Sequence, residues 1–248
     1  MRNNSFEEII SVLDGADTVL ILTHVIIDGD AAGTAAALAR ILELRGKTAH
    51  VFTGEELPHN LRILEGENFF RDREKLLPAY DAVVAADCSD ESRFRDRRDL
   101  YDRGKVHVNI DHHHTNSMYA EYNYVDGDAA AAGEILYEMI RQAGWEMDVK
   151  AAEGIYAAIV TDTGEFEYSS TTAKTHRIAA DLFDIGIDIN EISVAIYQNE
   201  RKLKVQVHSD ILQTMDFLCD ERFVMVHAPA ELFEKRGAVI ADSDGIIE

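Results

Sequence analysis

Four apolar runs constrain the fold of this chain more than any other feature of its sequence. They are TVLILTH (residues 18–24), KTAHVFTG (47–54), DAVVAAD (81–87) and KVHVNIDHH (105–113). Such short runs are typical of strands that are buried on both faces. Amphipathic patterns typical of helices occupy residues 30–46, 133–144, 150–164 and 172–186. Strands that alternate with helices predict an α/β fold with a parallel, doubly wound sheet.

The pattern also predicts a division of the 248 residues. We expect one domain in residues 1–190, a long connecting helix in residues 191–215, and the beginning of a second α/β domain in residues 216–248. Domains usually need about 50 residues or more to bury a core. The second domain is therefore expected to be truncated.

Charge and composition exclude several classes of function. The formal net charge of -22 disfavours long nucleic acid tracts as partners. Acidic residues interrupt the clearest basic segment, RFRDRRDLYDR (93–103), which is predicted to be a solvated helix face. Two cysteines give no disulfide framework. The chain shows no leader pattern and no apolar run of about 18 residues, so we expect a cytoplasmic protein with no membrane partner.

Carboxylates and imidazoles follow three of the predicted strands. They are His24, Asp28 and Asp30 after the first, Asp87 after the third, and Asp111, His112 and His113 after the fourth. The carboxyl ends of parallel strands meet at one edge of a sheet, where ligands bind. We therefore expect these side chains to share one site.

Acidic side chains gathered in this way would repel one another unless cations neutralised them. Oxygen-rich ligands with imidazole suit Mn²⁺ or Mg²⁺ better than a structural Zn²⁺, and there are enough donors for two cations. Taken singly, Asp30 is explained as a helix N-cap, and Asp28 with Gly29 as a turn. Their joint occurrence at strand ends favours a metal site.

Four motifs resemble those of the DHH phosphoesterase superfamily. In chain order they are THVIIDGDAAGT, AADCSD, IDHHHTN and AAIVTDTGEF. The resemblance covers nearly the whole chain and is greatest to the group of bifunctional oligoribonucleases and 3'-phosphoadenosine-5'-phosphate phosphatases. It implies a phosphoesterase that depends on two divalent cations, Mn²⁺ first with Mg²⁺ or Co²⁺ as alternatives, which would share a hydroxide nucleophile.

The resemblance also implies a role for each residue. The first cation would be held by His24, Asp28 and Asp87, and the second by Asp30, Asp87, His112 and Asp162. Asp111 would orient His112, His113 would face the scissile phosphate as a catalytic residue, and His114 is a further candidate for substrate contact. The implied substrates are short oligonucleotides, linear dinucleotides and 3'-phosphoadenosine-5'-phosphate, and a homodimer is one option for the assembly.

The chain departs from the family pattern at three places. Ile27 stands where the family has Pro, and Ala131 and Ala132 stand where it has hydroxyl residues. No Gly-Gly-Gly-His loop of the DHH-associated domain occurs before residue 248. Three alternatives stay open: a cyclic dinucleotide phosphodiesterase, a manganese pyrophosphatase, and a non-catalytic metal-binding or nucleotide-binding protein.

Overall fold

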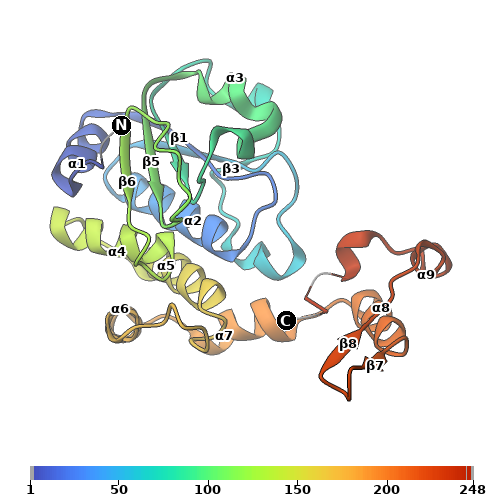
Figure 1. Cartoon of the computed structure of the whole chain (residues 1–248). Coiled ribbons are helices and arrows are strands. Elements are labelled where there is room, and N and C mark those ends of the chain that lie inside the picture. The colour runs from blue at the N-terminus through green and yellow to red at the C-terminus, as the bar shows by residue number, and fades with distance from the viewer. Residues whose placement is uncertain (1–2, 244, 247–248) are drawn as a thin grey trace. The chain divides into compact units, whose positions relative to one another are not determined.

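The computed structural model describes residues 3–243 and 245–246 of the chain (Figure 1). The chain forms two compact units, Met1–Ala195 and Ile196–Glu248. Each unit has its own elements and is described by itself below.

The first unit is built on a six-stranded sheet in the order β3-β2-β1-β4-β5-β6, in which every neighbouring pair is parallel. Its strands are β1 (Thr18–Leu22), β2 (Thr48–Phe52), β3 (Phe69–Phe70), β4 (Tyr80–Ala86), β5 (Gly104–Asp111) and β6 (Tyr122–Val125). The predicted α/β fold with a parallel sheet is therefore confirmed. The sequence analysis missed the two edge strands β3 and β6.

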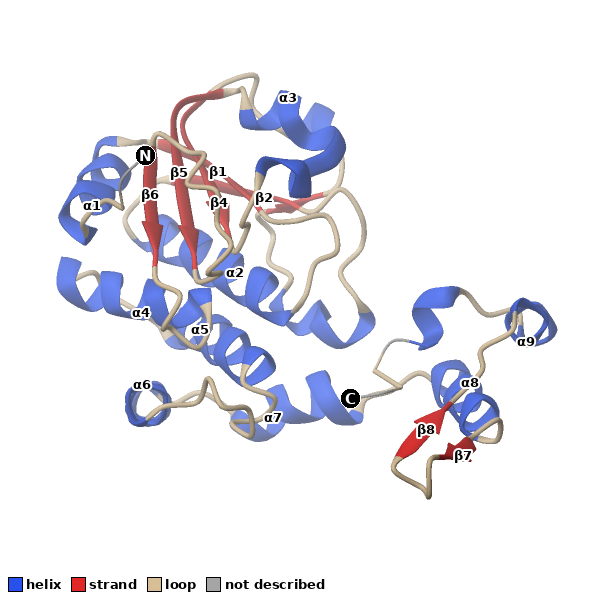
Figure 2. Ribbon diagram, viewed as in Figure 1, coloured by secondary structure: helices blue, strands red, loops and turns tan. Residues whose placement is uncertain are grey.

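Seven α-helices of the described chain belong to this unit (Figure 2). They are α1 (Phe6–Gly15), α2 (Gly29–Leu44), α3 (Arg98–Tyr101), α4 (Ala132–Ala143), α5 (Val149–Asp162), α6 (Ala173–Ile185) and α7 (Ile189–Ser193). Three 3₁₀ segments, His59–Leu64, Arg73–Lys75 and Glu91–Arg97, lie in the connections. The predicted helices correspond to α2, α4, α5 and α6, whereas α1 was not predicted.

Both faces of the sheet are buried. On one face, Leu20 and Leu22 of β1 pack in a cluster with Phe94, Leu100 and Tyr101 from the segment that follows β4. Successive side chains of a strand point to opposite faces, and the alternate residues of β1 are fully buried too. On that second face, helix α2 contacts β1, β2 and β4, and α4 contacts β5.

Helices α2 and α5 cross at very short range. A Cβ atom on Gly33 would lie 2.3 Å from the backbone oxygen of Gly154, and a Cβ on Gly29 would lie 2.3 Å from Oγ1 of Thr161. Only glycine allows backbones to approach this closely. The crossing therefore brings the N-terminus of α2 beside the C-terminal end of α5, at Asp162.

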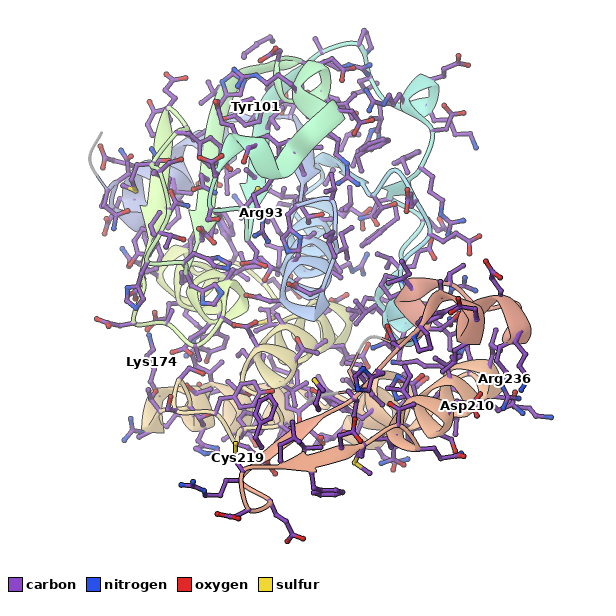
Figure 3. All side chains as sticks on the ribbon, turned by 45° about the vertical axis from the view of Figure 1, so that its right-hand side comes forward. Arg93, Tyr101, Lys174, Asp210, Cys219 and Arg236 are labelled. Carbon is purple, nitrogen blue, oxygen red and sulfur yellow. The ribbon has the colours of Figure 1, made fainter. Side chains whose placement is uncertain are left out.

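The second unit contains α8 (Lys202–Leu212), an antiparallel hairpin of β7 (Asp216–Leu218) and β8 (Phe223–Met225), and α9 (Ala230–Arg236). Val207, Ile211 and Phe233 form its small core. Arg236 and Asp210, both labelled in Figure 3, form a bidentate ion pair between α9 and α8, at 2.7 Å from Nε to Oδ2 and 2.9 Å from Nη2 to Oδ1.

The single long helix predicted for residues 191–215 is wrong. Helix α7 ends at Ser193, a π-helical turn follows over Val194–Gln198, and α8 begins only after Arg201, whose backbone is extended. Residues 198–202, Gln-Asn-Glu-Arg-Lys, are all polar. They interrupt the apolar stripe that would stabilise a continuous helix.

Among the described residues, no helix has both the length and the apolar character needed to cross a membrane.

Candidate metal centre

The predicted ligands converge at the carboxyl ends of β1, β4 and β5. Their donor atoms form three groups, in each of which one atom per residue lies within 4.8 Å of the others. The groups are His24 with Asp28 and Asp87, Asp30 with His112 and Asp162, and Asp87 with His112 and His113. Side chains from four separate parts of the chain therefore meet at one place.

The first group surrounds a buried histidine. Nε2 of His24 lies 3.3 Å from Oδ2 of Asp28 and 3.5 Å from Oδ2 of Asp87. His24 and Asp87 are almost fully buried, whereas the side chain of Asp28 is 56% exposed. The first group thus consists of two buried donors, His24 and Asp87, and one solvent-accessible donor, Asp28.

The second group surrounds His112. Its Nε2 lies 3.5 Å from Oδ2 of Asp30, 3.4 Å from Oδ2 of Asp162 and 3.6 Å from Oδ1 of Asp87. Since the other oxygen of Asp87 faces His24, this carboxylate joins the two groups.

Several of these atoms lack the partners that buried polar atoms require. Among the described residues, both ring nitrogens of His24 and Oδ1 of Asp87 are buried without a hydrogen-bond partner. Such atoms are rare in folded proteins and need an explanation. Divalent cations provide it, because carboxylate oxygens and imidazole nitrogens are their usual ligands. The residues present therefore suit divalent metal binding.

The backbone of Asp87 is itself unusual. Its φ angle is 50°, in the left-handed region that residues other than glycine seldom adopt. The amide of Asp87 donates to the carbonyl of Ile110 at 2.9 Å, which ties the end of β4 to β5. Strained conformations of this kind cluster at functional sites.

Asp30 is held rigidly by four contacts. Its Oδ1 accepts hydrogen bonds from the Thr34 hydroxyl at 2.9 Å and the Gly133 amide at 3.1 Å, and its Oδ2 accepts one from the Ala132 amide at 2.6 Å. Oδ2 also faces His112. The side chain of Asp30 is therefore held in one orientation, with Oδ2 toward His112.

These contacts correct the expected capping roles. Asp28, not Asp30, is the N-cap of α2, because its Oδ1 accepts from the Ala31 amide at 3.0 Å. Asp30 instead caps α4, whose own N-cap residue, Ala131, has no side-chain oxygen. Gly29 is the first residue of α2 rather than a turn residue with positive φ.

The expectation that Asp111 orients His112 is also wrong. Oδ1 of Asp111 lies 2.7 Å from Nδ1 of His113, while Nδ1 of His112 faces the carbonyl of Ala129 at 3.4 Å. The reason is the alternation of side chains in an extended chain, which places residues 111 and 113 on the same side.

Sequence reasoning missed the amide residues behind this pair. Nδ2 of Asn116 donates to Oδ2 of Asp111 at 2.5 Å and to Oδ1 of Asn109 at 2.8 Å. Asn109 in turn donates to the carbonyls of Ala85 and Cys88. Asn116 is the last residue of the IDHHHTN motif. Its position in the motif could have indicated a role beside the histidines.

His114 does not join any of the three metal groups found among the described residues. It is exposed, and its ring lies where a Cβ atom on Gly127 would be. Its proposed contact with substrate stays a prediction.

Electrostatics reflect the concentration of negative charge. Burial, together with the charges of Asp87 and Asp162, raises the pKa of Asp30 well above its ordinary value. Burial also raises the pKa of Asp162 to about 6, with the charge of His112 opposing and those of Asp87 and Asp28 assisting. Protons or cations must balance such a cluster.

Two of the histidines at the site, His24 and His113, have raised pKa values. Burial opposes the charged form of His24, but the facing carboxylates of Asp28 and Asp87 raise its pKa to about 9. The hydrogen bond with Asp111 raises the pKa of His113. Cation binding would displace protons held in this way.

Comparison with known proteins agrees with this geometry. The model of the DHH family, N-terminal domain, matches residues 18–159, and the chain therefore belongs to the DHH family. The resemblance inferred from the motifs is confirmed at the level of the family.

Relatives extend the similarity beyond that domain. The chain is 30% identical over 224 residues to the bifunctional oligoribonuclease and PAP phosphatase NrnA of Thermus thermophilus, covering 90% of this chain and 66% of that protein. It is 28% identical over 243 residues to the NrnA of Bacillus subtilis, covering 97% and 75% respectively. The chain thus spans about two thirds to three quarters of the length of these relatives. Family and relatives together support a hydrolase of phosphoric ester bonds.

A solved structure confirms the fold. An exopolyphosphatase-related protein from Bacteroides fragilis superimposes with a TM-score of 0.90 at 23% identity, over 98% of this chain and 74% of that one.

Proposed function

We propose that this protein is a divalent-metal-dependent phosphoesterase for short oligonucleotides and small nucleotides, including linear dinucleotides and 3'-phosphoadenosine-5'-phosphate. The observation that carries the proposal is the position of Asp87, whose two carboxylate oxygens face His24 and His112 at 3.5 and 3.6 Å. One carboxylate that faces two groups of donors can be shared by a pair of cations held close together, as in two-metal phosphoesterase sites. The names of the NrnA relatives support the substrate class.

In this proposal the donors divide as the motifs imply. The first cation is assigned to His24, Asp28 and Asp87, and the second to Asp30, Asp87, His112 and Asp162. Two bound cations, Mn²⁺ first with Mg²⁺ or Co²⁺ as alternatives, would make water a better nucleophile and neutralise charge on the phosphate. The hydrogen bonds of Asp30 to Ala132 and Gly133 hold that ligand in place.

His113 is assigned the proton transfer. Asp111 engages its Nδ1, which leaves Nε2 as the outward nitrogen of a side chain that is 36% exposed. A protonated His113 can donate to the leaving oxygen of the substrate. Asp111 fixes the orientation of the ring and stabilises its charged form, and is therefore a positioning residue.

The proposal extends to the surroundings of the protein. The net charge of -22 favours small anionic substrates over long strands. Cys88 and Cys219 are free thiols, which fits the cytoplasm as the proposed location. The proposed homodimer can be tested by sedimentation.

A turnover panel tests the function. The full chain with Mn²⁺ is assayed on 3'-phosphoadenosine-5'-phosphate, linear diadenylate, cyclic diadenylate, a short RNA and pyrophosphate. We expect turnover of the first two and of short RNA, and its loss in Asp87→Ala. Asp14→Ala is the matched control, since Asp14 is an exposed acid that pairs with Arg45. Preference for cyclic diadenylate or pyrophosphate, or unchanged activity of Asp87→Ala, would contradict the proposal.

A further inference from the structure

A pocket of about 360 Å³ is lined in part by the loop that carries the first two proposed ligands, and it has no role in the function proposed above. Val25 and Ile26, from the loop between His24 and Asp28, form one side of it. Three arginines, Arg71, Arg73 and Arg97, also line it. Two carboxylates, Glu55 and Asp96, line it as well, so its arginines outnumber its acids by three to two. The pocket thus has an excess of positive charge in a chain of strongly negative charge, and Val25 and Ile26 are adjacent in sequence to proposed cation ligands.

Arg97 is the unusual member of this group. It is only 4% exposed, and among the described residues no carboxylate lies within ion-pair distance of it. Its guanidinium donates to the backbone carbonyls of Thr23, at 3.3 Å, and Thr53. A guanidinium carries five N–H donors, so donors remain for another partner. The charges of Asp96 and Glu55 act on Arg97 only from beyond ion-pair distance, so an anion in direct contact would stabilise this buried charge further.

This burial was not expected from the sequence. The segment 93–103 is not a solvated helix face throughout, because Phe94, Arg97, Leu100 and Tyr101 are all buried. Their spacing of three and four residues is that of one helical face. The same spacing directs Arg97 inward with its apolar neighbours.

Arg71 and Arg73 line the same pocket with partly exposed side chains. Arg73 pairs with Asp96 at 2.8 Å and with Asp99 at 2.6 Å, and Arg71 pairs with Glu56 at 3.2 Å and with Glu65. Ion pairs between exposed groups are weak and easily exchanged. Both arginines can therefore turn to a stronger anion.

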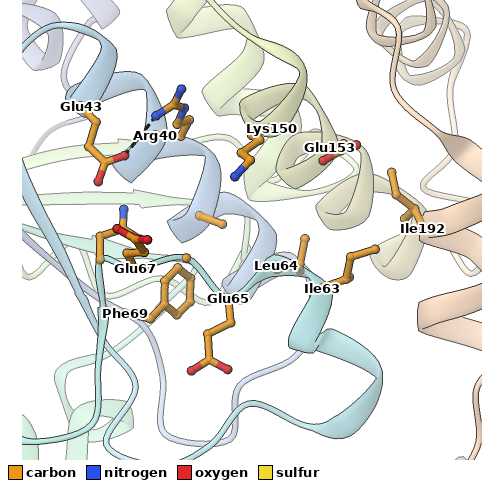
Figure 4. Close-up of a pocket in the computed structure, with 13 residues that line it drawn as sticks. Arg40, Glu43, Ile63, Leu64, Glu65, Glu67, Phe69, Lys150, Glu153 and Ile192 are labelled. Carbon is orange, nitrogen blue, oxygen red and sulfur yellow. Dashed lines mark ion pairs between the residues drawn. The ribbon is translucent and has the colours of Figure 1, made fainter.

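A second pocket, of about 300 Å³, lacks these properties (Figure 4). Its cations, Arg40 and Lys150, share the lining with four glutamates, and Arg40 is already paired with Asp148 and Glu43. Of the two pockets, only the one around Arg97 offers a buried cation without a carboxylate partner among the described residues.

We propose that the pocket lined by Arg71, Arg73 and Arg97 binds a phosphoryl group, separately from the phosphate that reacts at the metal centre. Arginine forks bind phosphate oxygens in pairs of parallel hydrogen bonds. The group has two possible sources: a second phosphate of the substrate, which rests on the proposed function, or a free phosphate ion, which does not.

Calorimetric titration of inorganic phosphate into the full chain with a chelator tests the site directly, because the acidic metal centre repels phosphate when no cation is bound. We expect binding by the wild type and at least about ten-fold weaker binding by Arg97→Gln and by Arg71→Gln/Arg73→Gln. The double variant spares the carbonyl contacts of Arg97, so it decides the question if Arg97→Gln does not fold. Arg98→Gln is the control, because Arg98 also pairs with two acids, Glu91 and Asp102, but does not line the pocket.

Absence of phosphate binding by the wild type, or equal loss in Arg98→Gln, would overturn the proposal. Full phosphate binding by the folded double variant would also overturn it, whether or not Arg97→Gln folds.

A kinetic comparison then identifies the source of the phosphate. With Mn²⁺, 3'-phosphoadenosine-5'-phosphate and 3'-adenosine monophosphate present the same 3'-phosphate, and only the first has a second one. If the pocket binds the second phosphate, Arg71→Gln/Arg73→Gln raises KM about ten-fold for the bisphosphate alone. If phosphate binding is lost but neither KM changes, the ligand is free phosphate. A chain without turnover refutes the proposed function but leaves the titration valid.

Discussion

Oδ2 of Asp30 accepts a hydrogen bond at 2.6 Å from the amide of Ala132, which is 102 residues later in the chain and opens helix α4. A proposed cation ligand therefore also accepts hydrogen bonds from the first amides of a distant helix, whose own N-cap residue, Ala131, offers no side-chain acceptor. Replacing it by alanine leaves the amides of Ala132 and Gly133 buried without this partner. With a chelator present, we expect Asp30→Ala to lower the free energy of unfolding by about 1–3 kcal/mol. Urea denaturation measures this, with Asp30→Asn as the control because it keeps an acceptor oxygen. Equal stability of Asp30→Ala and the wild type would refute the capping role.

The pairing of Asp111 with His113 makes a kinetic prediction. If Asp111 positions His113, Asp111→Asn should lower kcat about 10- to 100-fold and leave the affinity for Mn²⁺ unchanged. His113→Gln should lower kcat about 10²- to 10⁴-fold, and the double variant should be no slower than His113→Gln alone. Steady-state kinetics and calorimetry separate the two effects. A larger loss of Mn²⁺ affinity than of kcat would instead mean that Asp111 supports a cation ligand.

The shared carboxylate of Asp87 predicts different stoichiometries for two variants. Asp87→Ala should weaken both cation sites, since Asp87 faces His24 and His112. Asp162→Ala should weaken only the site around His112, because Asp162 belongs to that group alone. Calorimetry with Mn²⁺ should therefore give two sites for the wild type and one strong site for Asp162→Ala. Free Mn²⁺ at 100 times Kd should raise the free energy of unfolding by about 2.7 kcal/mol for each intact site. Identical titrations of the two variants would contradict a bridging role.

Polar residues that follow apolar runs were enough to locate the predicted site. His24, Asp87 and His112 each come at or just after the end of a strand, and parallel topology brings such ends together. Asp162 required the resemblance, because it closes a helix and reaches the site only through the crossing of α2 and α5. That crossing depends on the close backbone approach of Gly33 and Gly154, which a periodic pattern does not reveal.

The remaining errors have local causes. Strand β6 is a short edge strand of four residues, too short for its alternation to be recognised. The partner of Asp111 depended on which of two adjacent histidines faces it, and this follows from backbone direction rather than from residue type. The burial of Arg97 was concealed because acidic neighbours made its segment look uniformly solvated.

The crossing of α2 and α5 can be tested with one methyl group. In Gly33→Ala the new Cβ would lie 2.3 Å from a carbonyl oxygen of α5, so the helices must separate. We expect a loss of about 1–3 kcal/mol in the free energy of unfolding and weaker Mn²⁺ binding, because the N-terminus of α2 moves away from Asp162. Gly15→Ala is the control, since a Cβ atom there would meet nothing within 4 Å outside its own helix among the described residues. Equal effects of the two substitutions would contradict the tight crossing.

The carboxylate of Asp81, which joins β4 to the start of β1, predicts a dependence of stability on pH. The hydrogen bond from Lys105, with those from the amide and hydroxyl of Thr18, holds the pKa of Asp81 below its ordinary value. A lowered folded-state pKa gives stability that is present above the unfolded pKa, about 3.9, and is lost as the pH falls through the folded value. The stability difference between the wild type and Asp81→Asn should thus be largest above about pH 5 and shrink toward about pH 2. Urea titrations across this range measure it, and a constant difference would refute the assignment.

At Asp87 the left-handed backbone favours one residue type and the proposed function favours another. A residue without a Cβ atom would adopt this φ of 50° with less strain, and it would also remove one carboxylate from a crowded acidic cluster. Selection for folding alone would therefore favour glycine here, and only the proposed shared cation ligand favours aspartate. Asp87 is thus a residue whose backbone conformation disfavours it and whose proposed role in cation binding favours it.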